Sequence, residues 1–131
     1  MQVESRIGKI SRDAEDIYPL LSDFTKAATM MPQDKLKDAV IEADRVKVNH
    51  PEAGDIEFKI MEKTPCTQIK YSGVIKNSFD FFMWLQLKTV ADHDTRLKIT
   101  IRAEVPSVIG WTIKGKIKEM LDQIMDRIEK I

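Results

Sequence analysis

The sequence predicts an α+β fold in which a curved, seven-stranded antiparallel sheet wraps around one long C-terminal helix. Between residues 45 and 105, apolar and polar side chains alternate in successive segments separated by short turns, as in strands with one buried face. Residues 107–131 instead carry apolar side chains three and four positions apart, the spacing of an amphipathic helix. Short turns favour antiparallel neighbours. The apolar face of the sheet needs a cover, and the long helix can supply it.

The first part of the chain predicts one strand and two short helices. The strand covers residues 2–10, and its alternation places three side chains on the buried side: Val3, Ser5 and Ile7. A helix over residues 13–22 follows, although Pro19 removes one of its backbone donors. A second short helix ends at Pro32 and carries four apolar side chains: Phe24, Ala27, Met30 and Met31.

Six further strands are predicted in hairpin order. They cover residues 37–43, 45–50, 55–63, 67–75, 79–90 and 95–105. The final helix, residues 107–131, is about 37 Å long at 1.5 Å per residue, which is enough to cross a small domain. Its apolar stripe consists of Ile113, Ile117, Met120, Leu121, Ile124, Ile128 and Ile131.

The composition indicates a soluble protein with one domain over residues 1–131. The chain is 43% hydrophobic, and its 21 basic and 21 acidic residues cancel, so its net charge provides no basic field for nucleic acid or an acidic membrane. No stretch approaches the roughly 18 apolar residues of a membrane span, and the first residues lack a signal-peptide core. The single cysteine, Cys66, fits a reducing compartment. We therefore expect a cytoplasmic protein with neither a nucleic-acid partner nor membrane insertion.

The inner faces of the sheet and the helix are candidates for the wall of a ligand cavity, because such cavities are mostly apolar with a few polar groups. The alternative is that the same side chains only fill the core. Tyr71 is the best polar candidate: its hydroxyl needs a partner, which is either a ligand oxygen or another group of the protein. The expected ligand-binding residues are Phe58, Ile60, Ile69, Tyr71, Phe81, Met83, Leu85, Ile99, Ile117, Met120, Leu121 and Ile124.

Catalytic and metal-binding motifs are not evident. The sequence has no glycine-rich phosphate loop, no nucleophile elbow, and neither HExxH nor CxxC. His50 and His93 fall in predicted turns without recognisable ligand spacing, and Cys66 has no base at motif distance. We therefore assign no catalytic residue, no metal ligand and no cofactor.

Two aromatic residues conflict with a solvated outer sheet face. Phe82 and Trp84 share parity with Gln86 and Lys88, which point outward. Either a bulge turns them inward, or they form an exposed apolar patch that could join two copies in a homodimer. Trp111, at the start of the long helix, is a further candidate for such a patch.

Several stretches resemble small bacterial members of the START-like superfamily, also called SRPBCC. The superfamily includes birch-pollen-allergen-like proteins, polyketide cyclases and lipid-transfer domains. The resemblance extends over nearly the whole chain, and it implies a helix-grip fold with an apolar cavity between sheet and helix. The stretches that carry it are residues 17–24 (IYPLLSDF), 62–65 (EKTP), 79–88 (FDFFMWLQLK) and 95–101 (TRLKITI).

Together these observations predict the binding or transport of a small hydrophobic or lipid-like ligand. One alternative is a polyketide cyclase-like or dehydratase-like enzyme, which the resemblance supports. No His, Asp or Glu stands clearly at inward parity for general acid–base work, so we favour binding over catalysis. The other alternative is a protein-interaction domain with a filled core, as in the co-chaperone and ribosome-associated proteins that share this fold.

Overall fold

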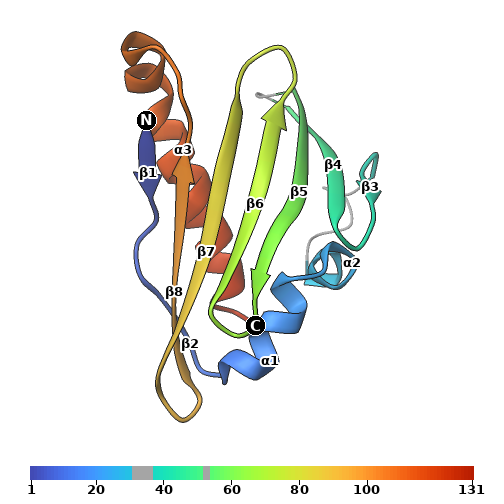
Figure 1. The fold of residues 1–131 in the computed structure, drawn as a ribbon, viewed down its shortest axis with the longest axis vertical. Helices are drawn as coiled ribbons and strands as arrows, with labels where there is room; N and C mark the ends of the chain where they lie inside the picture. The colour runs from blue at the N-terminus through green and yellow to red at the C-terminus, as the bar shows by residue number, and fades with distance from the viewer. Residues whose placement is uncertain (31–36, 52–53) are drawn as a thin grey trace.

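The computed structural model describes residues 1–30, 37–51 and 54–131, and it confirms the α+β helix-grip architecture (Figure 1). A curved antiparallel sheet lies against the long helix α3, and two short helices follow the first strands. The elements are β1 (Gln2–Glu4), β2 (Gly8–Ile10), α1 (Ala14–Leu21), α2 (Phe24–Ala27), the 3-10 helix η1 (Ala28–Met30), β3 (Val40–Ile41), β4 (Arg45–His50), β5 (Gly54–Thr64), β6 (Gln68–Ile75), β7 (Asp80–Ala91), β8 (Asp94–Arg102) and α3 (Ser107–Ile128).

Within residues 1–30, 37–51 and 54–131, the sheet has eight strands rather than the predicted seven. Its order is β1-β8-β7-β6-β5-β4-β3, and β2 also pairs with β8. The additional strand arises because the predicted strand over residues 2–10 divides into β1 and β2, which pair with successive parts of β8. All of these pairings are antiparallel, as the short connections predict.

An extra residue between β1 and β2 explains a wrong prediction for Ile7. Glu4 lies opposite Thr100, whereas Gly8 lies opposite Leu97, so one residue is inserted on the β1–β2 side. Such a bulge exchanges the two faces of the strand beyond it. Ile7 is therefore 58% exposed instead of buried. In the second half of the predicted strand, the buried residues are Gly8 and Ile10 of β2.

Ser5 stabilises this bulge with both its backbone and its side chain. Its N–H donates to the oxygen of Ile99 at 2.8 Å, and its hydroxyl accepts from the N–H of Ile99 at 2.9 Å. The hydroxyl also donates to the oxygen of Arg6 at 2.8 Å. Ser5 is buried at inward parity, as predicted, and these contacts all lie within the protein.

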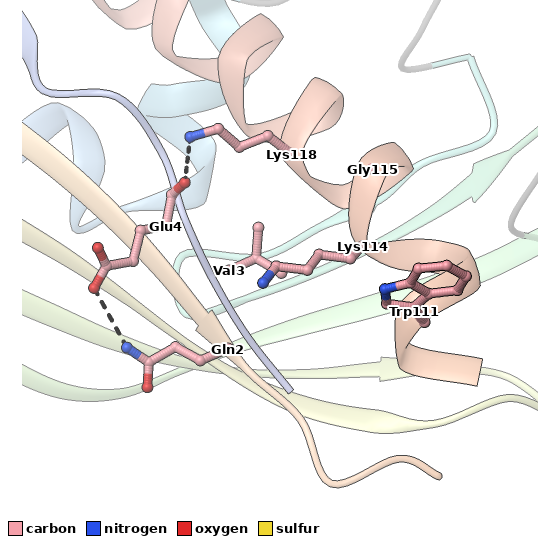
Figure 2. A pocket seen from close by; sticks show the side chains of 7 residues that line it. All are labelled: Gln2, Val3, Glu4, Trp111, Lys114, Gly115 and Lys118. Carbon is pink, nitrogen blue, oxygen red and sulfur yellow. Dashed lines mark hydrogen bonds between the residues drawn. The ribbon is translucent and has the colours of Figure 1, made fainter. Parts of the chain in front are cut away.

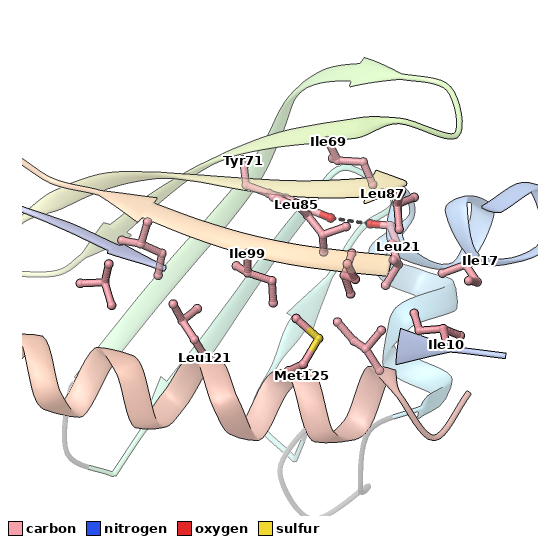
Figure 3. Close-up of a cluster of buried hydrophobic side chains, with 14 of the residues drawn as sticks. Ile10, Ile17, Leu21, Ile69, Tyr71, Leu85, Leu87, Ile99, Leu121 and Met125 are labelled. Carbon is pink, nitrogen blue, oxygen red and sulfur yellow. Dashed lines mark hydrogen bonds between the residues drawn. The ribbon is translucent and has the colours of Figure 1, made fainter. Parts of the chain in front are cut away.

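The core lies between α3 and the inner face of the sheet (Figure 3). Leu121 and Met125 of α3 are fully buried against it. Met125 occupies the space above Gly8, where a Cβ atom would stand 2.2 Å from the methionine sulfur. This close approach lets α3 lie directly on β2. Figure 1 shows α3 behind β1, β8 and β7, while β5, β4 and β3 extend beyond it.

Other predicted boundaries need smaller corrections. The predicted strand over residues 37–43 is reduced to β3, the strand over 95–105 ends at Arg102, and the last helix ends at Ile128. Helix α1 accommodates Pro19 and ends two residues later. The second predicted helix corresponds to α2 and η1; its predicted residues Met31 and Pro32 lie outside the described residues.

Candidate ligand-binding face

Strands β5 to β8 carry most of the predicted ligand-binding residues on one face. The antiparallel register places them in three rows across the sheet. Because neighbouring strands are in register, side chains of the same row are cross-strand neighbours and contact one another. The rows are Phe58, Gly73 and Phe81; Ile60, Tyr71 and Met83; and Ile69, Leu85 and Ile99.

The twelve predicted residues divide by burial. Six are buried: Ile69, Tyr71, Phe81, Leu85, Ile99 and Leu121. The other six are only partly buried: Phe58, Ile60 and Met83 on the sheet, and Ile117, Met120 and Ile124 on α3. Five of these six pack against the buried core, so they lie at its margin rather than on the outer surface.

Tyr71 has a protein partner for its hydroxyl. It donates a hydrogen bond to the backbone oxygen of Leu21 at 2.7 Å, so that β6 is tied to the end of α1 (Figure 3). Its ring lies 5.7 Å from that of Phe24. Burial, and to a smaller extent the neighbouring Tyr18, raises the pKa of Tyr71, which keeps the phenol protonated. The sequence left two possible partners for this hydroxyl, a ligand oxygen or another group of the protein, and the structure shows a backbone oxygen of the protein.

An aromatic cluster continues the inner face beside Tyr71. The Phe81 ring packs edge-on against Phe58, with centroids 5.6 Å apart, and it lies 6.2 Å from the Phe79 ring. Phe81 also lies directly over Gly73, where a Cβ atom would come within 2.1 Å of the ring. The absence of a side chain at Gly73 therefore makes room for this ring.

Phe82 and Trp84 lie on the outer face of the sheet, so of the two predicted alternatives, a bulge that turns them inward is excluded. The register between β7 and β8 is regular at both residues, and no bulge turns them inward. Phe82 is 43% exposed, and the two ring centroids are 6.1 Å apart. The Lys70 ammonium lies 4.7 Å from the Phe82 centroid and 5.5 Å from that of Trp84. We call these two aromatic residues with Lys70 the outer aromatic patch.

Two surface hollows lie away from the inner face. One, of about 670 Å³, lies between β1 and the first half of α3 (Figure 2). It is lined by Gln2, Val3, Glu4, Trp111, Lys114, Gly115 and Lys118. The other, of about 780 Å³, lies near the end of α3 and includes Arg12, Leu20 and Arg127. None of the twelve predicted residues lines either hollow. The sequence singled out Trp111 as part of a possible apolar patch, and the fold places it with Lys114 and Lys118 next to β1.

His93 and Cys66 each lie in a turn between two strands. The N–H of His93, in the turn between β7 and β8, donates to the Asp13 carboxylate at 2.8 Å, and its Nδ1 lies 3.2 Å from the same carboxylate. Cys66 is partly buried in the turn between β5 and β6. Within the described residues, no three His, Cys, Asp or Glu side chains gather as metal ligands. No helix of that part of the chain has the length and apolar character of a membrane span.

Comparisons with known proteins identify the architecture. Neither a protein-family model nor a curated protein matches the sequence. Among solved structures, a START superfamily protein from Mycobacterium smegmatis has a TM-score of 0.71 at 15% identity, over 98% of this chain and 94% of that one. An HSP90 activator from Plasmodium falciparum has a TM-score of 0.60 at 16% identity, over 87% and 89% of the two chains.

A third similar structure is a protein from the dynemicin biosynthetic locus, with a TM-score of 0.71 at 10% identity. The match covers 98% of this chain but 46% of that one, so the chain spans about half of its length. At such identities the likeness concerns the backbone arrangement and carries no residue's role across. The strand order, the long final helix and these neighbours together show that the chain has the START-like, or SRPBCC-like, helix-grip fold.

Proposed function

We propose that the protein binds a small hydrophobic or lipid-like ligand between the inner face of the sheet and α3. The observation that carries this proposal is that apolar side chains at the margin of the core, on both the sheet and the helix, are only partly buried. Phe58, Ile60 and Met83 project from the sheet, and Ile117 and Ile124 from the helix. Water contact with apolar surface is unfavourable, and a bound apolar molecule would remove it.

The chemistry of this margin suits an apolar ligand. The partly buried Phe58 ring, which packs against the buried Phe81 ring, offers a large apolar surface, and Met83 is flexible enough to adapt to different shapes. Among known proteins of this fold, one similar structure is described as a START superfamily protein and another comes from the dynemicin biosynthetic locus. A single reduced cysteine, Cys66, is consistent with a cytoplasmic protein.

Tyr71 restricts the polar group that such a ligand can carry. The hydroxyl proton is donated to Leu21, so the phenol oxygen has only acceptor capacity left. A ligand group that meets Tyr71 must therefore donate a hydrogen bond, as a hydroxyl or an amide does. A ketone or an ester oxygen cannot fill this role while the bond to Leu21 is intact.

Cyclase-like or dehydratase-like catalysis has less support. General acid–base catalysis is most effective when the pKa of the group lies near the working pH. Burial raises the pKa of both Tyr71 and Tyr18, which removes these two inner phenols further from neutrality. Both phenols therefore stay neutral near pH 7, which favours binding over reaction.

Titration with Nile red, a neutral hydrophobic dye, tests the binding proposal. Met83→Trp should fill the inner margin and weaken dye binding at least tenfold. Met61→Trp is the matched control, because Met61 is 54% exposed and should leave binding unchanged. Ile117→Trp fills the same margin from α3 and serves if Met83→Trp does not fold. Equal affinities for all three variants would refute the proposal. Native mass spectrometry of the purified protein would show a ligand that copurifies.

The outer aromatic patch supports a second candidate role, as an interface between two copies of the chain. Phe82 is 43% exposed and Val74, on the same face of the neighbouring strand, is 44% exposed. Aromatic residues are enriched at protein interfaces. Light scattering should give a dimer mass for the wild-type chain and a monomer mass for Trp84→Glu. A wild-type monomer at all concentrations would exclude this role.

A further inference from the structure

We propose that the first half of α3 is a docking surface for an anionic lipid membrane. This inference goes beyond the proposed ligand site and does not depend on it. It begins with three apolar side chains at the start of the helix: Val108 is 79% exposed, Ile109 48% and Trp111 88%. Large exposed apolar groups in one place mark surfaces that contact a partner or a membrane. We call residues 108–118 the docking segment.

The docking segment has the side-chain arrangement of an interfacial helix. At 100° per residue, Val108, Trp111 and Gly115 share one solvent-facing sector. Lys114 and Lys118 stand on one flank of that sector and Lys116 on the other. An apolar centre between lysine flanks lets the apolar groups enter the headgroup region while the ammonium groups reach the lipid phosphates. Tryptophan is enriched at this depth of a bilayer.

The charge of α3 is divided along its length. The docking segment contains three lysines and no acidic residue, whereas Asp and Glu outnumber Lys and Arg from residue 119 onward. The net charge of zero for the whole chain therefore conceals a local basic region. The first turn of α3 also has no acidic residue to offset the partial positive charge of the helix N-terminus. The helix terminus and the lysines together attract anions.

The surroundings leave most of this positive charge available. Among the described residues, Lys114 and Lys116 form no ion pair. Lys118 donates to the backbone oxygen of Glu4 (Figure 2). The Glu4 carboxylate is itself paired with Lys98 at 3.1 Å, which reduces its effect on the lysines of α3. The hollow between β1 and α3 is lined by Trp111, Lys114 and Lys118, and the Glu4 carboxylate that also lines it is paired with Lys98.

A second copy of the chain is a less suitable occupant. Two copies that met through this surface in a symmetric dimer would bring the same lysines together, and their repulsion would oppose the contact. A membrane with anionic headgroups removes that repulsion and covers Trp111 and Val108 at the same time. Charge and exposed apolar area therefore both favour the lipid surface.

Vesicle flotation tests the proposal with the full chain. The wild-type protein should float with vesicles of mixed phosphatidylcholine and phosphatidylglycerol, but not with phosphatidylcholine alone, and high salt should release it. Replacing Lys114 and Lys116 by Gln should lower the partition coefficient about fivefold for each lysine. Trp111→Glu should abolish flotation. These side chains are exposed, so circular dichroism should show unchanged folding.

Trp84→Phe is the matched control, because it alters the other tryptophan of the chain, which lies on the outer face of the sheet and outside the docking segment. It should float like the wild type, and its remaining fluorescence, from Trp111, should shift to the blue when vesicles are added. Flotation that is independent of phosphatidylglycerol or unaffected by Trp111→Glu would overturn the proposal. The proposal would also be overturned if the wild-type chain did not bind vesicles and instead self-associated through Trp111, as judged on a sizing column. Nile red binding by Trp111→Glu separates this surface from the ligand site, where the variant should behave normally.

Discussion

The hydroxyl of Tyr71 donates a hydrogen bond to the backbone oxygen of Leu21 inside the core, at 2.7 Å. Leu21 is the last residue of α1, and the final carbonyl groups of a helix lack partners within the helix. Tyr71 therefore satisfies a helix end from the middle of β6. This bond positions α1 against the inner face of the sheet, at one side of the proposed ligand site.

Tyr71→Phe should destabilise the protein by about 1–3 kcal/mol, because it leaves the Leu21 carbonyl buried without a partner. Urea denaturation followed by circular dichroism measures this change. Tyr18→Phe is the control: Tyr18 is only partly buried, and its hydroxyl has no recorded hydrogen bond among the described residues. A larger loss for Tyr18→Phe than for Tyr71→Phe would contradict this account of the buried bond.

Gly73→Ala should destabilise the protein by about 1–3 kcal/mol, since the added methyl group would meet the buried Phe81 ring. The matched substitution Gly115→Ala has open space around it on α3 and should stabilise the protein by up to about 1 kcal/mol through helix propensity. Thermal melts of the two variants should therefore shift in opposite directions. Shifts of the same sign would show that packing over Gly73 is not limiting.

Ser5→Ala should destabilise the protein by about 1–3 kcal/mol. The hydroxyl accepts the N–H of Ile99 in the buried part of the sheet, and alanine would leave that donor unpaired. Hydrogen exchange at Ile99 should accelerate in the variant, while Ser72→Ala, in the middle of β6, should leave it unchanged. Unaltered protection of Ile99 would mean that another acceptor replaces the hydroxyl.

The ion pair between Arg6 and Glu129 should make stability depend on acid pH. The Arg6 guanidinium, and then the Lys9 backbone N–H, lower the pKa of Glu129 in the folded protein. A carboxylate with a lowered folded-state pKa contributes stability above its unfolded pKa, about 4.3, and loses the contribution as pH falls through the folded value.

Glu129→Gln should therefore be less stable than the wild type at neutral pH, with the difference shrinking as the pH falls below about 4.3 and disappearing below the lowered folded-state pKa of Glu129. Denaturation midpoints across this range measure the effect. Asp126 also pairs with Arg6 and will retain part of the attraction. Glu119→Gln, which removes an exposed carboxylate without a recorded ion pair in the described region, should show no such convergence. A constant difference between wild type and Glu129→Gln at every pH would refute the assignment.

The sequence by itself determined the architecture and the composition of the inner face. Alternation over residues 55–63, 67–75 and 95–105 predicted β5, β6 and most of β8, because a strand's side-chain period depends only on local backbone geometry. The spacing of three and four predicted α3 for the same reason. Seven of the predicted ligand-binding residues on β5, β6 and α3 are buried or pack against the core, as these periods predict, and their role in ligand binding remains a prediction.

Only the tertiary structure decided the features that depend on distant partners. The inserted residue before Gly8 is visible only against the register of β8, and it turned Ile7 outward. The partner of Tyr71 lies 50 residues away in the sequence, and the regular pairing of β7 with β8 placed Trp84 outside. Periodicity specifies which side of an element a residue occupies. It does not specify which group from another element meets it there, because that depends on how the whole chain packs.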